Sequence, residues 1–193
     1  TFFDGFTGPF IPDTAIDGGM SDVSPIWNPE FFGNTMVVNG NTWPYLNVEP
    51  RQYRFRFLNG SDSRFFILSS AVPRKAQPIT FWQIGADGGF LAAPEARPEL
   101  LIGPAERADV IVDFSAYRPG DTITLLNIGP DEPFGGGVPG VDFPKSDAGT
   151  TGQVMQFRVV PLGPADTSTP VAKLDLPKPV NLGMATNTRT LSL

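Results

Sequence analysis

Hydrophobic and polar positions alternate along much of the chain, most clearly over residues 52–59 (QYRFRFLN). Successive side chains of a β-strand point to opposite faces, so residues two apart share a face. This stretch therefore has an aromatic face and a polar face, made of Tyr53, Phe55 and Phe57 on one side and Gln52, Arg54 and Arg56 on the other. We expect a half-buried strand whose rings fill a core and whose arginines face outward.

Eight short segments have this strand-like character, because they are rich in β-branched or aromatic residues and are bounded by turn residues. They span residues 35–40, 52–59, 64–70, 79–85, 99–103, 108–114, 121–128 and 152–160. No convincing amphipathic helix competes with them, and short strands at near-regular spacing are typical of β-sandwiches and Greek-key barrels. The pattern predicts an all-β domain over residues 34–160.

The segments around this domain have neither strand nor helix periodicity. Residues 1–33 are rich in Pro, Gly and aromatic rings, which predicts an extended lead-in from a first domain. Residues 129–151 interrupt the strands and predict a long mobile surface loop. Residues 161–193 begin as a proline-rich linker and end in NTRTLSL (187–193), which we interpret as the first strand of a third domain missing from this chain.

Composition and charge narrow the functional classes. The chain has 21 Gly and 21 Pro among 193 residues, which disfavours a helical protein. Its net charge of −6 provides no basic field for nucleic acid, and the alternation in residues 52–59 separates the rings from the arginines. No run of 18 apolar residues is present, so we expect no membrane span. We expect a soluble chain, outside the cytoplasm in preference to inside it.

The chain has no His and no Cys, which excludes the usual zinc and blue-copper sites and any Ser-His-Asp or Cys-His catalytic arrangement. Residues 135–140 match G-x-G-x-x-G in letters, but Pro139 prevents a helix from starting there, so we interpret them as a flexible loop. Asp109 and Asp113 share a face of their predicted strand, and a carboxylate pair could serve glycoside hydrolysis. Charged ends around an apolar run are, however, typical of ordinary strands. We expect no catalytic, cofactor-binding or metal-binding residue.

The outward-facing arginines of the strand at 52–59 predict structural ion pairs with carboxylates on neighbouring segments. The candidate residues of this structural set are Arg54, Arg56, Glu106, Arg107 and Asp109.

Residues 29–68 (PEFFGNTMVVNGNTWPYLNVEPRQYRFRFLNGSDSRFFIL) resemble the middle domain of three-domain bacterial multicopper oxidases, of the spore-coat laccase, bilirubin oxidase and phenoxazinone synthase type. Similar motifs follow in order at FWQIGADGGFL (81–91), GPAERADVIVDF (103–114) and QVMQFRV (153–159). NTRTLSL (187–193) resembles the opening of the third domain of these oxidases.

The resemblance implies a cupredoxin-like Greek-key fold with extended N- and C-terminal linkers. In that family the copper ligands lie in the first and third domains, and the middle domain acts as a copper-free spacer. None of the four methionines matches a ligand motif: Met20, Met36, Met155 and Met184. The resemblance thus implies a domain that is inert alone, inside an oxidase that oxidises phenolic or similar substrates and reduces dioxygen to water. Its expected partners are the flanking cupredoxin domains, or another copy of the chain where they are absent.

Two other functional classes remain open from the sequence. The chain is alternatively a self-standing β-sandwich module that binds protein or carbohydrate. It is also compatible with a histidine-free carboxylate enzyme, which requires two acidic residues that converge in a cleft and have raised pKa values.

Overall fold

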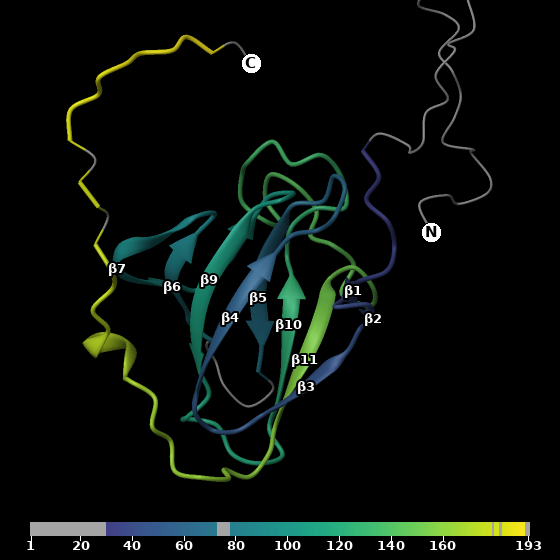
Figure 1. Ribbon diagram of the computed structural model, residues 1–193. Helices are drawn as coiled ribbons and strands as arrows, with labels where there is room; N and C mark the ends of the chain where they lie inside the picture. The colour runs from purple at the N-terminus through teal and green to yellow at the C-terminus, as the bar shows by residue number, and fades with distance from the viewer. Residues whose placement is uncertain (1–29, 73–77, 179, 182, 192–193) are drawn as a thin grey trace, which may run out of the picture.

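The computed structural model shows two β-sheets packed face to face (Figure 1). The residues that the structure describes are 30–72, 78–178, 180–181 and 183–191. Most of the expected lead-in, residues 1–29, lies outside them.

The described strands form two sheets and one short hairpin. The five-stranded sheet has the order β3 (Tyr45–Val48), β11 (Gln153–Val159), β10 (Thr122–Asn127), β5 (Phe66–Ala71) and β8 (Leu100–Ile102). The four-stranded sheet has the order β4 (Gln52–Leu58), β9 (Arg107–Asp113), β6 (Phe81–Ala86) and β7 (Gly89–Arg97). The hairpin is made of β1 (Val37–Val38) and β2 (Asn41–Thr42). All pairs are antiparallel except β3 with β11, and the expected all-β sandwich is confirmed.

The aromatic face of β4 points into the space between the two sheets. The ring centroid of Phe55 lies 5.5 Å from that of Phe157 on β11 and 6.5 Å from that of Phe114. Phe114 and Phe157 are themselves 5.2 Å apart. Arg54 and Arg56 are exposed on the outer face, as the alternation predicts. A shift of one residue in register would bury both arginines, so the pattern of β4 determines its pairing.

Strand β7 was not expected from the sequence pattern. Gly and Ala make up four of its nine residues (GFLAAPEAR), and Pro94 lies within it. Proline is tolerated there because β7 is the edge of its sheet, where one row of backbone N–H groups has no strand to bind. The hydrophobic periodicity of an edge strand is weak, since little of it is buried.

The linker after β11 is extended, as expected, but it also packs on the domain. It runs along the outer side of the four-stranded sheet (Figure 1), where Val171 and Leu176 are buried against Ile84 and Ile111. The short 3-10 turn η1 (Val171–Lys173) lies in this contact. No other helix occurs in the described part of the chain, and none there has the length and apolar character to cross a membrane.

The segment expected to begin a further strand is not paired in the structure. Residues 187–191 have no strand assignment and run away from both sheets (Figure 1). A strand forms only where a neighbour satisfies its backbone groups, so this segment stays extended and unpaired within the described chain.

Replacing the Phe55 ring tests its position between the sheets. Phe55→Ala should lower the free energy of unfolding by about 3 kcal/mol, because loss of a packed aromatic ring leaves a cavity. Arg56→Ala is the matched control on the opposite face, and it should change that free energy by less than about 0.5 kcal/mol. Urea denaturation measures both values, and equal losses in the two variants would contradict the assigned faces.

Candidate functional site

Two of the expected structural residues form one ion pair across β4 and β9. Arg54 donates from Nε and Nη2 to the two carboxylate oxygens of Asp109, and the Nε–Oδ1 distance is 2.8 Å. The hydrogen bond to Asp109 raises the pKa of Arg54. Arg56 stands opposite Asp109 in the strand register, yet it has no ion pair among the described residues.

The other two expected residues close turns. The Glu106 carboxylate accepts a hydrogen bond of 2.6 Å from the backbone N–H of Gly103, within its own turn. Arg107 lies 3.4 Å from the carboxylate of Asp87, in an exposed pair. The expected set is therefore one cross-strand pair, an unpaired arginine and two turn contacts, and it does not form a single site.

The structure reveals a buried polar cluster around Arg64 that the sequence interpretation missed. The Arg64 side chain is 2% exposed and forms an ion pair with Asp131. Its Nη2 also donates to the carbonyl oxygens of Phe32 at 2.8 Å and Gly33 at 3.0 Å. Nη1 donates to the carbonyl oxygen of Pro130 at 3.3 Å. A buried guanidinium with this many acceptors holds three segments together: the end of the lead-in, the start of β5 and the loop after β10.

The loop at residues 129–151 is anchored at both ends by this cluster. Asp131 accepts hydrogen bonds from the hydroxyls of Ser146 at 3.0 Å and Thr151 at 2.7 Å. Ser146 and Thr151 are buried. The interpretation as a surface loop is correct for its middle, but its two ends are bound into the domain. Within the loop no helix follows the glycine motif.

Asn59 and Asn127 complete the polar interior next to Arg64. The side-chain amide of Asn59 donates to the carbonyl oxygens of Arg64 at 2.7 Å and Ile102 at 3.0 Å. Asn127 donates to the Ser146 hydroxyl at 3.0 Å. An Asn-Gly pair such as residues 59–60 is typical of a turn, but nothing in the sequence indicates that the Asn59 side chain is buried.

The pKa of Asp131 reflects competing effects. Burial alone would raise it, but hydrogen bonds from Thr151, Arg64 and Ser146, together with the charge of Arg64, lower it below its usual value. The pKa of Asp166 is also lowered, by hydrogen bonds from Ser168. Both shifts are opposite to those that a carboxylate general acid requires, so these two residues offer no support for a carboxylate enzyme.

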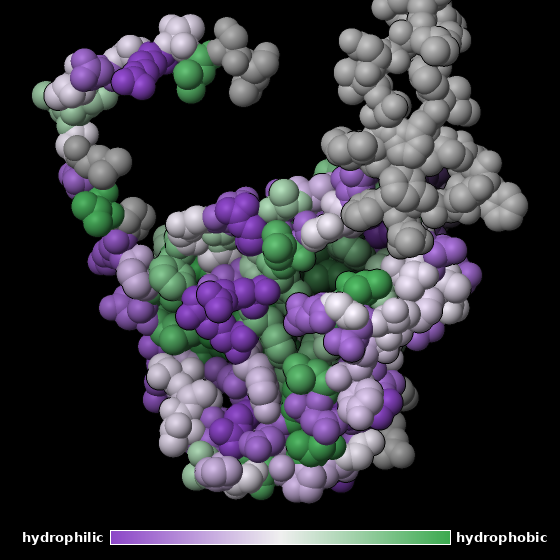
Figure 2. All heavy atoms as spheres, turned by 45° about the vertical axis from the view of Figure 1, so that its right-hand side comes forward, coloured by the Kyte–Doolittle hydropathy of each residue, from purple (hydrophilic) through white to green (hydrophobic). Residues whose placement is uncertain are grey.

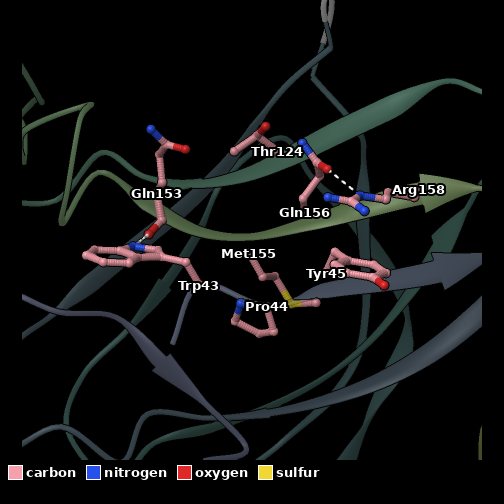
Figure 3. Close-up of a pocket in the computed structure, with 8 residues that line it drawn as sticks. All are labelled: Trp43, Pro44, Tyr45, Thr124, Gln153, Met155, Gln156 and Arg158. Carbon is pink, nitrogen blue, oxygen red and sulfur yellow. Dashed lines mark hydrogen bonds between the residues drawn. The ribbon is translucent and has the colours of Figure 1, made fainter. Parts of the chain in front are cut away.

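A shallow hollow of about 170 Å³ lies on the outer face of the five-stranded sheet. Figure 3 shows Trp43 at one end and Arg158 at the other, with Met155 between them. The Arg158 guanidinium carbon is 3.7 Å from the centroid of the Tyr45 ring, and its Nε donates to Gln156 at 2.7 Å. Figure 2 turns this side forward and shows hydrophobic side chains at the surface among polar ones. The hollow is amphipathic and has a single cation.

The residues of this chain do not fit a copper centre of the kind that the resemblance implies for its family. Type 1 copper is held by imidazole and thiolate ligands, and the sequence contains no His and no Cys. In the described ranges, no three acidic, His or Cys side chains gather as a metal site would require. Met155 shares the hollow with aromatic, hydroxyl, amide and guanidinium side chains, which do not complete a copper ligand set.

Removal of the Arg64 guanidinium should destabilise the domain strongly. We expect Arg64→Met to lower the free energy of unfolding by about 3 kcal/mol, because the buried acceptors lose their donor. Arg64→Lys should restore little of this loss, since one ammonium does not span the same acceptors. Urea denaturation measures the losses, with the exposed Arg107→Met as control. If Arg64→Lys were as stable as the wild type, the planar geometry of the guanidinium would not matter for stability, and this prediction would be wrong.

Asp131 should make stability depend on pH in acid. Its pKa is lower in the folded state, so its contribution is fully present above the unfolded-state value of about 4 and is lost as pH falls through the folded value. The urea midpoint of the wild type should therefore fall more steeply below about pH 4 than that of Asp131→Asn. If the urea midpoints of the two proteins changed with pH in parallel, Asp131 would not be the source of this pH dependence. At pH 7, the exposed neighbour Glu132→Gln should match the wild type.

Comparisons with known proteins agree with the resemblance. No protein-family model matches the chain. The laccase of Bacillus stratosphericus is 42% identical over 184 residues, which cover 94% of this chain and 32% of that protein. The bilirubin oxidase of Albifimbria verrucaria is 39% identical over 155 residues, covering 77% of this chain and 25% of that protein. The chain spans about a third of the length of the laccase and less of the bilirubin oxidase.

Solved structures show the same relationship. The McoA multicopper oxidase of Aquifex aeolicus matches with a TM-score of 0.58 and 33% identity, over 81% of this chain and 32% of that one. The laccase-like multicopper oxidase CueO of Ochrobactrum sp. matches with a TM-score of 0.55 and 28% identity, over 78% of this chain and 28% of that one. These likenesses confirm the expected cupredoxin-like fold. Sequence and fold together place this chain in the multicopper oxidase family.

Proposed function

We propose that this chain is the copper-free middle domain of a laccase-like multicopper oxidase and that it is catalytically inert alone. The observation that carries the proposal is the absence of His and Cys from a sequence that aligns with laccases over nearly its whole length. Copper ligation of the type 1 kind needs those side chains. A member of this family that lacks them contributes structure to the oxidase, while other domains hold the metal.

The activity of the whole oxidase is part of this proposal. We infer that it oxidises phenolic or similar substrates and reduces dioxygen to water, as the resemblance to laccases implies. Since the chain aligns with 32% of the Bacillus stratosphericus laccase, the remaining two thirds of such a protein provide room for two flanking cupredoxin domains. These domains are the proposed partners of this chain, and copper belongs to them.

A spacer domain has to fix the directions in which its neighbours are attached, and the structure supports this role at both ends. Arg64 holds the backbone of Phe32 and Gly33 where the lead-in joins the sandwich. Val171 and Leu176 hold the exit segment on the outer face of the four-stranded sheet. We propose the division into a lead-in (1–33), a cupredoxin-like domain (34–160) and a linker with the opening strand of a third domain (161–193).

Copper binding and oxidation assays test the proposal directly. After incubation with Cu²⁺ and desalting, the purified chain should keep well below one copper ion per molecule, because it lacks imidazole and thiolate ligands. It should also show no oxidation of a phenolic substrate above the rate of free Cu²⁺. A laccase from Bacillus stratosphericus treated in the same way is the positive control. Stoichiometric copper together with phenol oxidation in the isolated chain would overturn the proposed function.

A further inference from the structure

Trp43 lies on the surface in a backbone conformation that large side chains rarely adopt. Its φ of +40° is in the left-handed region, and Pro44 restricts its backbone further. Strained residues of this kind persist only where their surroundings hold them, and they gather at binding sites. Here the indole Nε1 donates to the carbonyl oxygen of Gln153 at 2.9 Å, while the ring remains 42% exposed. The ring is therefore fixed in place and presented to solvent.

The neighbours of Trp43 have the composition of a protein interface. Tyr45, Met155 and Arg158 line the same hollow (Figure 3). Trp, Tyr, Met and Arg are enriched in interface cores, and Trp, Tyr and Arg dominate binding hot spots. The hollow of about 170 Å³ is smaller than the usual small-molecule pocket of about 300–1,000 Å³. Arg158 also covers one face of the Tyr45 ring, which blocks a sugar from stacking there.

The two outer faces of the sandwich differ in what covers them. The C-terminal segment covers part of the four-stranded sheet through Val171 and Leu176. Among the described residues, no segment covers Trp43 and Tyr45 in this way, and both rings are exposed. The lead-in ends at residue 33, three residues before Met36, whose carbonyl oxygen accepts a hydrogen bond of 3.0 Å from the backbone N–H of Trp43. A domain tethered through the lead-in would have a high effective concentration at this face.

We propose that Trp43, Tyr45, Met155 and Arg158 form the docking surface for the cupredoxin-like domain that precedes this one in the oxidase, with Trp43 as the anchor. The inference rests on the proposed function and adds to it the face that carries the contact. Among the described residues, Arg158 is the only cation that lines the hollow. The facing surface of the partner should therefore present an apolar centre with carboxylate or carbonyl oxygens opposite Arg158.

Cysteine labelling tests this proposal, because the chain contains no native Cys. Gln153→Cys places a thiol beside Trp43, and Glu95→Cys places the control thiol on the other sheet; both native residues are exposed. Each variant is studied in the isolated chain and in a chimera in which this chain replaces the aligned third of the Bacillus stratosphericus laccase. We expect maleimide to react about tenfold more slowly with Gln153→Cys in the chimera, since interface cores exclude solvent. The rate at Glu95→Cys should be the same in both proteins.

Three outcomes would overturn the docking surface. The first is an equal rate at Gln153→Cys in the two proteins. The second is protection in the isolated chain that grows with protein concentration, which would assign the surface to a second copy. If the chimera does not fold, the thiol is placed at the aligned position of the Bacillus stratosphericus laccase itself. A protected thiol there supports the proposal, and a reactive one is the third overturning outcome.

The same experiment separates this inference from the proposed function. An active chimera with a fully reactive Gln153→Cys would leave the structural role of the domain intact and remove only the docking surface. Stoichiometric copper and oxidase activity in the isolated chain would remove the proposed function, whatever the labelling at residue 153 shows.

Discussion

The packing of the β4 rings between the two sheets is the contact on which the rest of the structure depends. Phe55 meets Phe114 and Phe157, so residues from three distant parts of the chain are joined in one aromatic group. Burial of such rings is the main favourable term in folding a domain of this size. Once the rings face inward, Arg54 must face outward, where it pairs with Asp109. The register of β4 against β9 follows from this division.

A second constraint is the buried charge of Arg64. Taking a guanidinium out of water is costly unless its N–H groups find acceptors and its charge finds an opposite charge. Here the acceptors are the carbonyl oxygens of Phe32, Gly33 and Pro130, and the opposite charge is the carboxylate of Asp131. All of these acceptors belong to irregular segments, which have no strand pairing to hold them. Arg64 therefore gives fixed geometry to the parts of the chain that join the sandwich to its surroundings.

These features suit a domain whose contribution to an oxidase is positional. The core between the sheets is mainly apolar, and the Arg64 guanidinium is bonded to the carboxylate of Asp131 and to backbone carbonyl oxygens. The surface has one face covered by the exit segment and another with the strained, exposed ring of Trp43. The docking surface that we propose gives the backbone strain at Trp43 a role in a contact outside the core. In the role that we propose, this sandwich gives fixed geometry to a multicopper oxidase.

The sequence alone determined the strand character of β4 and showed that the chain has no His and no Cys, because both are properties of local pattern and residue type. It also determined the family, through motifs such as residues 103–114. It did not indicate the roles of Arg64, Asp131 or Trp43. Arg64 binds groups up to 82 positions away, and Trp43 is held by a carbonyl 110 positions away. Only the tertiary structure decided these roles, because burial, partners and backbone strain arise when distant segments meet.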